Sequence, residues 1–214
     1  MLYCLSQYAS NRFKYIIMKH DFTESEKWVC DSCGRNVTSM RMKYWPPDLF
    51  LEGGKRYPDY FTIPMPFEDK CGMIVSEKAL LAFQKEGVTG FESAPIKIND
   101  TDKRGRIIES PDMPKYYYLF VKGTISLDLK AMHYRKKNVC PACGSYTWSR
   151  QKIGDAALDY ASWDQSDICK LTDYPNTFIC TQKVIDVIKK NNLKGFYKNT
   201  EQDIFRPLRS EKIC

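Results

Sequence analysis

The sequence predicts an α+β fold in which two pseudo-duplicated strand–helix halves are joined at one zinc site. The first observation behind this prediction is a pair of CxxCG motifs, at 30–34 and 140–144. The second is an ungapped similarity between 72–91 and 177–196. The third is that a CxxCG motif and the helical unit after it occur twice in the same order, and both recur at nearly the same interval in the sequence. We therefore expect a single domain of 214 residues with two pseudo-repeats.

The first pseudo-repeat is expected to cover about 20–129, with its CxxCG motif at 30–34 and a helix at 77–86. The second is expected to cover about 130–214, with its motif at 140–144 and a helix at 182–190. In this arrangement the two motifs meet on one ion. The ion then joins distant segments, because a loop of this length adds only a logarithmic closure cost.

Each CxxCG motif is expected to form a zinc knuckle. Two thiolates three positions apart converge on one ion, and the glycine after them tolerates the positive φ of the turn that directs backbone N–H groups at sulfur. Two knuckles supply the four thiolates of a closed tetrahedral site. The predicted metal ligands are Cys30, Cys33, Cys140 and Cys143, and the predicted cofactor is structural zinc.

A redox function for the same cysteines is the alternative. A reactive CxxC normally begins a helix, whose N-terminal dipole lowers the thiol pKa. Here residues 35–38 and 145–148 favour strand after each motif. An odd total of nine cysteines is also a poor disulfide framework, and Cys169 and Cys180 lie in apolar surroundings typical of structural thiols. Structural zinc is preferred over disulfides or empty thiols, and four cysteines leave no open position for catalytic zinc.

The two helical units share one pattern. Apolar runs at 73–75 and 178–180 predict buried strands, and each run is followed by a hydroxyl residue, Ser76 or Thr181, that can cap a helix. Each helix carries apolar residues at i, i+1 and i+4. Gly87 and Asn192 accept the left-handed geometry that ends a helix.

The rest of the chain predicts additional strands and loops. Residues 116–121, YYYLFV, predict a strong strand, and the following Lys122-Gly123 predicts a turn. Alternating apolar residues at 125–129 predict a half-buried strand. Five prolines within 45–66 predict an irregular aromatic loop, and 100–106 predicts a polar loop tip.

Composition and charge limit the functions that this protein could have. No apolar run is long enough to span a membrane, and the N-terminus lacks the features of a secretory signal, so a cytoplasmic protein is expected. The net charge of +7 permits nucleic acid, anionic membrane or an acidic protein surface as a partner. Much of this charge lies in the basic stretch 130–152, which we interpret as a solvated face around the second knuckle.

Catalytic residues are not apparent. His20 and His133 precede the two motifs and could be spare ligands, but both are interpreted as surface residues. Gly53-Gly54-Lys55 lacks the spaced glycines and hydroxyl of a phosphate loop. No nucleophile–base pair stands out, so the chain is expected not to be an enzyme.

The two CxxCG motifs, the phrase ALLAFQKEGVTGF and the block LDYASWDQSDICKLTDYPNTFICTQKVIDVIKKNNLKGF together resemble the double-CxxCG motif family of bacterial proteins. The resemblance covers about 28–196. It departs from the family at 55–68, where a glycine- and proline-rich segment is replaced, and over the first ten residues. The resemblance implies an immunity protein of contact-dependent toxin exchange, which resides in the cytoplasm and neutralises one cognate toxin.

A zinc-ribbon protein that binds nucleic acid is the alternative function. The basic stretch interleaves Tyr134, Tyr146 and Trp148, which could stack on bases while the lysines and arginines follow the phosphate backbone. Packing of a β-ribbon would place these aromatics in the same positions. The sequence does not identify the toxin, the contact residues or the oligomeric state.

Overall fold

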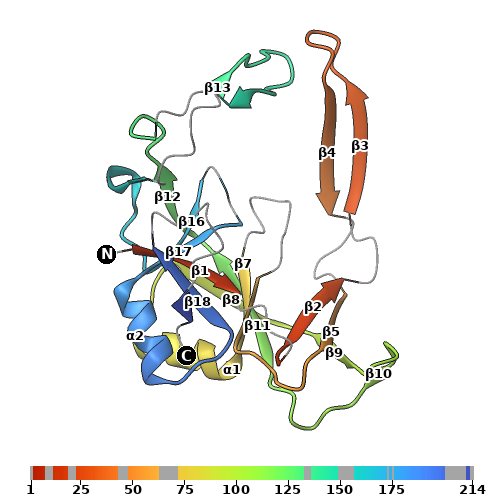
Figure 1. Ribbon diagram of the computed structural model, residues 1–214, viewed down its shortest axis with the longest axis vertical. Coiled ribbons are helices and arrows are strands. Elements are labelled where there is room, and N and C mark those ends of the chain that lie inside the picture. Colours follow the sequence, from red (N-terminus) through yellow and green to blue (C-terminus); the bar gives the residue numbers. More distant parts are fainter. Residues whose placement is uncertain are drawn as a thin grey trace.

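The computed structural model describes residues 2–7, 12–18, 23–42, 48–62, 72–132, 136–148, 157–172, 174, 176–200 and 211–212. Within these ranges the protein is mainly β. In the described part of the chain, nineteen strands form five sheets, and two α-helices accompany them. Figure 1 shows the helices on one side of the body and two ribbons that project from the opposite side.

The predicted α+β, pseudo-duplicated fold class is therefore wrong. The two predicted helices exist, but they are short elements of a protein built mostly from strands. The physical reason is that most of the strands have two to six residues and pair with partners far away in the chain. Such segments carry little periodic signal of their own, whereas a helix is specified by its neighbours in sequence.

The largest sheet has seven strands in the order β15-β12-β16-β17-β1-β18-β19. All neighbours are antiparallel except β12 and β16. The N-terminal strand β1 lies between two C-terminal strands, so that Cys4 is opposite both Ile179 and Asn199. The strands are β1 (Leu2–Gln7), β12 (Gly123–Leu127), β15 (Leu158–Asp159), β16 (Ile168–Leu171), β17 (Phe178–Thr181), β18 (Phe196–Thr200) and β19 (Glu211–Lys212).

Two four-stranded sheets complete the body. One, in the order β6-β7-β11-β8, is antiparallel throughout. The other, β10-β9-β5-β2, contains the parallel pair β5 and β9. The first is made of β6 (Tyr60–Thr62), β7 (Gly72–Ser76), β8 (Phe91–Ile96) and β11 (Tyr116–Val121), and the second of β2 (Lys14–Met18), β5 (Leu49–Gly53), β9 (Ile98–Thr101) and β10 (Ile107–Ile108).

Two of the strands correct the sequence analysis. The segment 45–66 was predicted to be an irregular loop, yet β5 and β6 lie within it and their apolar residues are almost fully buried. Residues 45–47 and 63–66 lie outside the described residues. None of the prolines at 46, 47, 58, 64 and 66 lies within either strand, so the proline count did not exclude strands from this segment.

At Lys122-Gly123, where the sequence predicts a turn, the chain leaves one sheet and enters another. β11 pairs with β7 and β8, whereas β12 begins at Gly123 and pairs with β15 and β16. A Cβ at position 123 would lie 2.3 Å from the carbonyl oxygen of Ile168. Glycine is therefore required here because two backbones approach closely.

The helices pack against strands of the seven-stranded sheet and of the sheet β6-β7-β11-β8. α1 (Glu77–Lys85) buries Ala79, Leu80, Ala82 and Phe83, and α2 (Gln182–Lys190) buries Val184, Ile185, Val187 and Ile188. Both sets belong to the largest apolar cluster. Gly87 and Asn192 have φ of 61° and 50°, which confirms the predicted helix ends.

The two N-caps differ. The Ser76 side chain accepts a hydrogen bond from the Ala79 backbone N–H at 3.2 Å, as predicted. Thr181 makes no side-chain cap bond, and its hydroxyl donates to Asp167 at 2.8 Å instead. The cap prediction for Thr181 is therefore wrong. Neither helix of the described residues is long and apolar enough to cross a membrane.

Candidate metal centre

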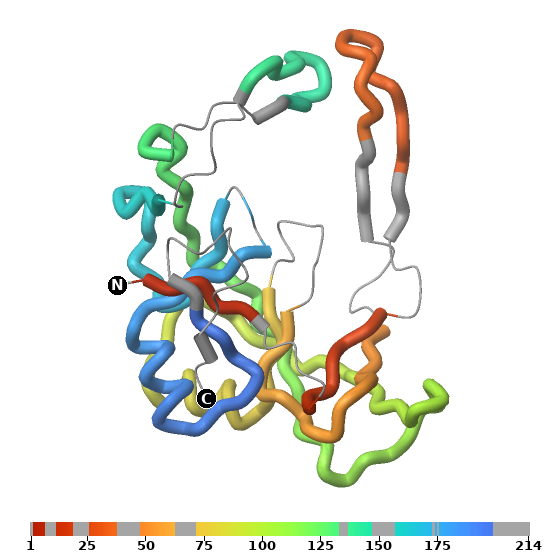
Figure 2. The backbone as a smooth tube through the Cα atoms, in the orientation of Figure 1, coloured from red at the N-terminus to blue at the C-terminus, as the bar shows by residue number. Residues whose placement is uncertain are grey.

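The two CxxCG motifs lie at the ends of two ribbons. The first is the turn that connects β3 (Thr23–Val29) and β4 (Asn36–Met42). The second lies between β13 (Lys136–Lys137) and β14 (Thr147–Trp148). Figures 1 and 2 show the turns of both ribbons near each other at the end of the molecule away from the helices.

Both motifs fold into the same tight turn. The Gly34 N–H donates to the Cys30 carbonyl at 2.7 Å, and the Gly144 N–H donates to the Cys140 carbonyl at 2.8 Å. The two glycines have the same φ of 68°. This left-handed conformation favours glycine, as the sequence predicted for the residue after each motif.

A second backbone bond closes each turn. The Cys30 N–H donates to the carbonyl of Arg35 at 2.9 Å, and the Cys140 N–H donates to the carbonyl of Ser145 at 2.8 Å. Strand pairing then begins directly outside this bond, with Val29 opposite Asn36 in the first ribbon. The ribbon fixes the backbone direction on both sides of each cysteine pair.

The four predicted ligands are brought together. The sulfur atoms of Cys30, Cys33, Cys140 and Cys143 all lie within 4.8 Å of one another. The Sγ atoms of Cys30 and Cys140 are 3.8 Å apart, and those of Cys33 and Cys143 are 3.7 Å apart. Each short contact joins one motif to the other, so the cluster could hold one metal ion shared by both ribbons.

The thiols of the cluster influence one another's ionisation. Bonds to the Ser145 side chain and backbone lower the pKa of Cys143 to about 6. A bond to the Arg35 backbone lowers the pKa of Cys33. A backbone bond from Ser32 acts to lower the pKa of Cys30, but burial and the contacts with Cys143 and Cys33 together outweigh it and raise the pKa to about 11. Like charges packed this closely repel one another, so all four thiols could ionise together only if a cation were bound among them.

Two residues beside the cluster were not singled out by the sequence analysis. The Ser145 hydroxyl lies 3.0 Å from the Cys143 sulfur and accepts a hydrogen bond from an Arg35 guanidinium nitrogen at 3.3 Å. Arg35 belongs to the first ribbon and Ser145 to the second, so this bond also joins the two. The sequence feature that could have identified Arg35 and Ser145 is their position directly after the two glycines.

The structure tests the predictions for Cys169 and Cys180 but not those for Cys214, His20 and His133. Cys169 and Cys180 are fully buried in the body, as expected of structural thiols. Burial raises the pKa of Cys169 to about 12 and that of Cys180 well above its ordinary value. Cys214, His20 and His133 lie outside the described residues.

Gly53-Gly54-Lys55, which the sequence analysis rejected as a phosphate loop, lines a cavity of about 660 Å³. The wall of this cavity contains a buried ion pair between Lys14 and Asp100. The same carboxylate accepts hydrogen bonds from the hydroxyls of Tyr57 at 2.5 Å and Ser110 at 2.6 Å and from the Thr101 N–H at 2.8 Å.

These partners decide the ionisation of Asp100. Burial acts to raise its pKa, but the hydrogen bonds from Lys14, Ser110 and Tyr57 outweigh burial, and the pKa is lowered. Asp100 is therefore held as a carboxylate whose oxygens are both occupied. This arrangement is typical of a polar network that fixes a backbone position.

A scan of the chain against protein-family models gives no match, and a search among curated proteins gives none either.

Proposed function

We propose that this protein is a zinc-stabilised immunity protein of the cytoplasm, which binds a cognate bacterial toxin and neutralises it by docking. The observation that carries the proposal is the convergence of four cysteines from two ribbons that are about a hundred residues apart in sequence. The resemblance of the motifs and helical blocks to the double-CxxCG family supplies the class of partner.

Zinc is the metal that the geometry supports best. In a tetrahedral site with Zn–S bonds of about 2.3 Å, neighbouring sulfur atoms are about 3.8 Å apart. The contacts of 3.8 Å and 3.7 Å between the two motifs agree with this spacing. Four thiolates are soft ligands, which select zinc over hard cations such as calcium or magnesium.

A role in shaping a surface follows from the ligand set. Four protein ligands close the coordination sphere of zinc and leave no position for a substrate. The ion would instead hold two projecting ribbons in a fixed relation. All seven cysteines of the described residues are free thiols, which supports a reducing compartment such as the cytoplasm.

The ends of the ribbons carry side chains suited to protein contact. Nine large apolar side chains are exposed in the described part of the chain, and four of them are close in sequence to the cluster cysteines: Trp28, Val29, Val139 and Tyr146. Apolar and aromatic side chains that are held rigidly are typical anchors of protein interfaces. Because the chain carries a net charge of +7, the contact surface of the toxin is expected to be acidic or neutral.

The test is to examine the neighbouring reading frames for a toxin gene and to co-express this protein with the toxin found there. The protein should restore growth of cells that produce the toxin, and purified protein should bind the toxin in calorimetry. Cys30→Ser combined with Cys143→Ser should lose both effects, because the ribbons are no longer joined. Absence of binding and of protection by the unaltered protein would contradict the proposal.

A nucleic-acid-binding zinc ribbon is the second candidate. It is favoured by exposed Tyr146 and Lys137 beside the second motif. Other members of the basic stretch, including Tyr134, Arg150 and Lys152, lie outside the described residues. Fluorescence polarisation with short single-stranded DNA and RNA separates the candidates: salt-dependent binding would favour this one, and no binding at low salt would exclude it.

A further inference from the structure

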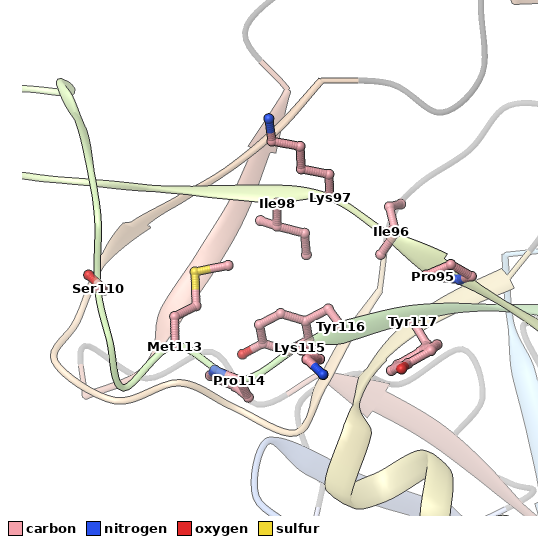
Figure 3. Close-up of a pocket in the computed structure, with 10 residues that line it drawn as sticks. All are labelled: Pro95, Ile96, Lys97, Ile98, Ser110, Met113, Pro114, Lys115, Tyr116 and Tyr117. Atoms are coloured by element: carbon pink, nitrogen blue, oxygen red, sulfur yellow. The ribbon is translucent and has the colours of Figure 1, made fainter.

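A groove with an apolar floor lies between β8, the start of β9 and the segment that leads into β11. Its volume is about 380 Å³. Ile96, Ile98 and Tyr116 form the floor and are 8%, 6% and 3% exposed. Figure 3 shows the Met113 side chain pointing toward Ile98 across this floor. The flexible thioether of a half-buried methionine adapts to different apolar groups.

The rim of the groove is positively charged. Lys97 and Lys115 are both exposed and project in different directions from the floor in Figure 3. None of the ten residues that line the groove is acidic. Lys115 has one weak ion pair, 3.8 Å from Glu77, and Lys97 forms no ion pair within the described residues. The groove therefore combines an apolar floor with two exposed ammonium groups, of which Lys97 has no ion pair among the described residues and Lys115 has only the weak one to Glu77.

The surroundings favour an extended chain as the occupant. β8 is an edge strand of its described sheet and pairs only with β11. Its Pro95 has no N–H and lies on the wall of the groove. Edge strands bearing proline resist continuous strand pairing while they still offer carbonyl groups to a peptide that lies alongside. A peptide lying alongside β8 in this way would place one of its side chains on the floor of the groove.

We propose that this groove binds an extended peptide segment of a protein partner, in which an aromatic or aliphatic residue is next to Asp or Glu. The apolar side chain occupies the floor over Ile98 and Tyr116, and the carboxylate pairs with Lys97 or Lys115. Identification of that partner as the toxin rests on the proposed function. The peptide chemistry rests on the groove alone, which is distinct from the ends of the ribbons.

The experiment is selection of a random twelve-residue peptide library on the immobilised full chain. Enriched peptides should carry Phe, Trp or Leu next to an acidic residue. Their affinity, measured by fluorescence polarisation, should fall about tenfold or more in Lys97→Glu/Lys115→Glu, because two attractive charges become repulsive. Met113→Gln should also weaken binding, through loss of the apolar contact.

A matched variant controls for charge. Lys103→Glu/Lys130→Glu makes the same change in net charge at exposed lysines that do not line the groove, and it should bind the peptides like the unaltered protein. Because all four lysines are exposed, both double variants should keep the unfolding temperature of the parent.

Three results would overturn the proposal. They are a library that yields no enriched peptide, enriched peptides that bind the Lys97→Glu/Lys115→Glu variant as tightly as the parent, and displacement of a peptide by sodium decanoate at concentrations below the peptide's own Kd. The third would show that the groove prefers a free amphipathic carboxylate. Failure of toxin neutralisation leaves the peptide result intact, so the two proposals fail separately.

Discussion

Cys30 is the residue whose chemistry depends most on its partners. It is 5% exposed, and its sulfur lies 3.8 Å from that of Cys140 in the other ribbon. Outside a metal site, a thiol this buried would stay protonated. Its position beside three other thiols is the arrangement that could hold a shared metal ion.

Cys30→Ser should remove the metal and lower the melting temperature. Structural zinc contributes about 10–16 kcal/mol of apparent binding free energy in small peptides, a value comparable to the whole stability of about 5–15 kcal/mol of a typical domain. Metal content by elemental analysis should fall from one ion per chain to nearly none. Ser32→Ala, at an exposed position within the same motif, is the control and should retain the ion. Full metal content in Cys30→Ser would show that the ligand set is wrong.

Asp100 supports a second prediction at the residue scale. Asp100→Asn removes the charge that is paired with buried Lys14, and such a change costs about 3–5 kcal/mol because an ammonium group stays buried without its counter-ion. Chemical denaturation should show this loss. Asp102→Asn removes a carboxylate paired with exposed Arg106, and a surface pair contributes only about 0–1 kcal/mol. Equal effects of the two substitutions would contradict the buried network.

The lowered pKa of Asp100 also predicts the pH dependence of stability. A carboxyl whose pKa is lower in the folded state stabilises the fold above its unfolded pKa of about 3.9. This contribution is lost as the pH falls from there through the folded pKa. Denaturation between pH 6 and pH 2.5 should show a steeper loss for the parent protein than for Asp100→Asn.

At the scale of elements, two carboxylates join the helices. Asp59 accepts from the Ser76 hydroxyl at 2.5 Å, before α1, and from the Lys194 N–H at 2.7 Å, after α2. Asp167 accepts from the Thr181 hydroxyl, before α2, and from the Thr89 N–H at 3.0 Å, after α1. Each carboxylate thus connects the start of one helix to the loop that follows the other.

Asp167→Ala should loosen this connection. It removes the acceptor for Thr181, for Thr89 and for the Lys183 ammonium, which is 2.9 Å away. Groups left without a partner cost about 1–3 kcal/mol each when buried, so a total loss of about 2–4 kcal/mol is expected for these partly exposed donors. Urea denaturation followed by circular dichroism measures it. Asp186→Ala, on the exposed face of α2, should change stability by less than about 0.5 kcal/mol.

The whole molecule depends on its N-terminal strand. β1 lies between β17 and β18, so the first described residues complete a sheet made largely from the C-terminal half. Leu5 packs in the cluster that contains both helices, whereas Leu2 and Cys4 pack in the cluster on the other side of the sheet. The strand therefore joins two parts of the core.

Leu5→Ala should destabilise the entire fold. The side chain is 3% exposed, and removal of a buried leucine side chain costs about 2–5 kcal/mol through lost transfer energy and the cavity left behind. Thermal unfolding should remain a single transition at a lower temperature. Leu81→Ala is the control, because Leu81 is 58% exposed on α1. Unfolding of β1 alone, with the helices unchanged, would refute this dependence.

Local elements were the part of the fold that could be predicted. The helices at 77–85 and 182–190, the strand at 116–121 and the turns at Gly34 and Gly144 match the sequence analysis closely. Each is specified by residues within one or two turns of chain. The strands β5 and β6 were missed because the five prolines of 45–66 favour a loop, although none of them lies within either strand.

The sequence by itself determined which residues form the candidate metal centre. Two CxxCG motifs carry their own turn geometry, so the four cysteines were identified without knowledge of the fold. Only the tertiary structure decided that the protein is mainly β, that β1 completes the largest sheet and that Asp59, Asp100 and Asp167 connect distant segments. The physical reason is that turns and helices are set by local contacts, whereas strand pairing and buried ion pairs are chosen among many distant partners by the packing of the whole chain.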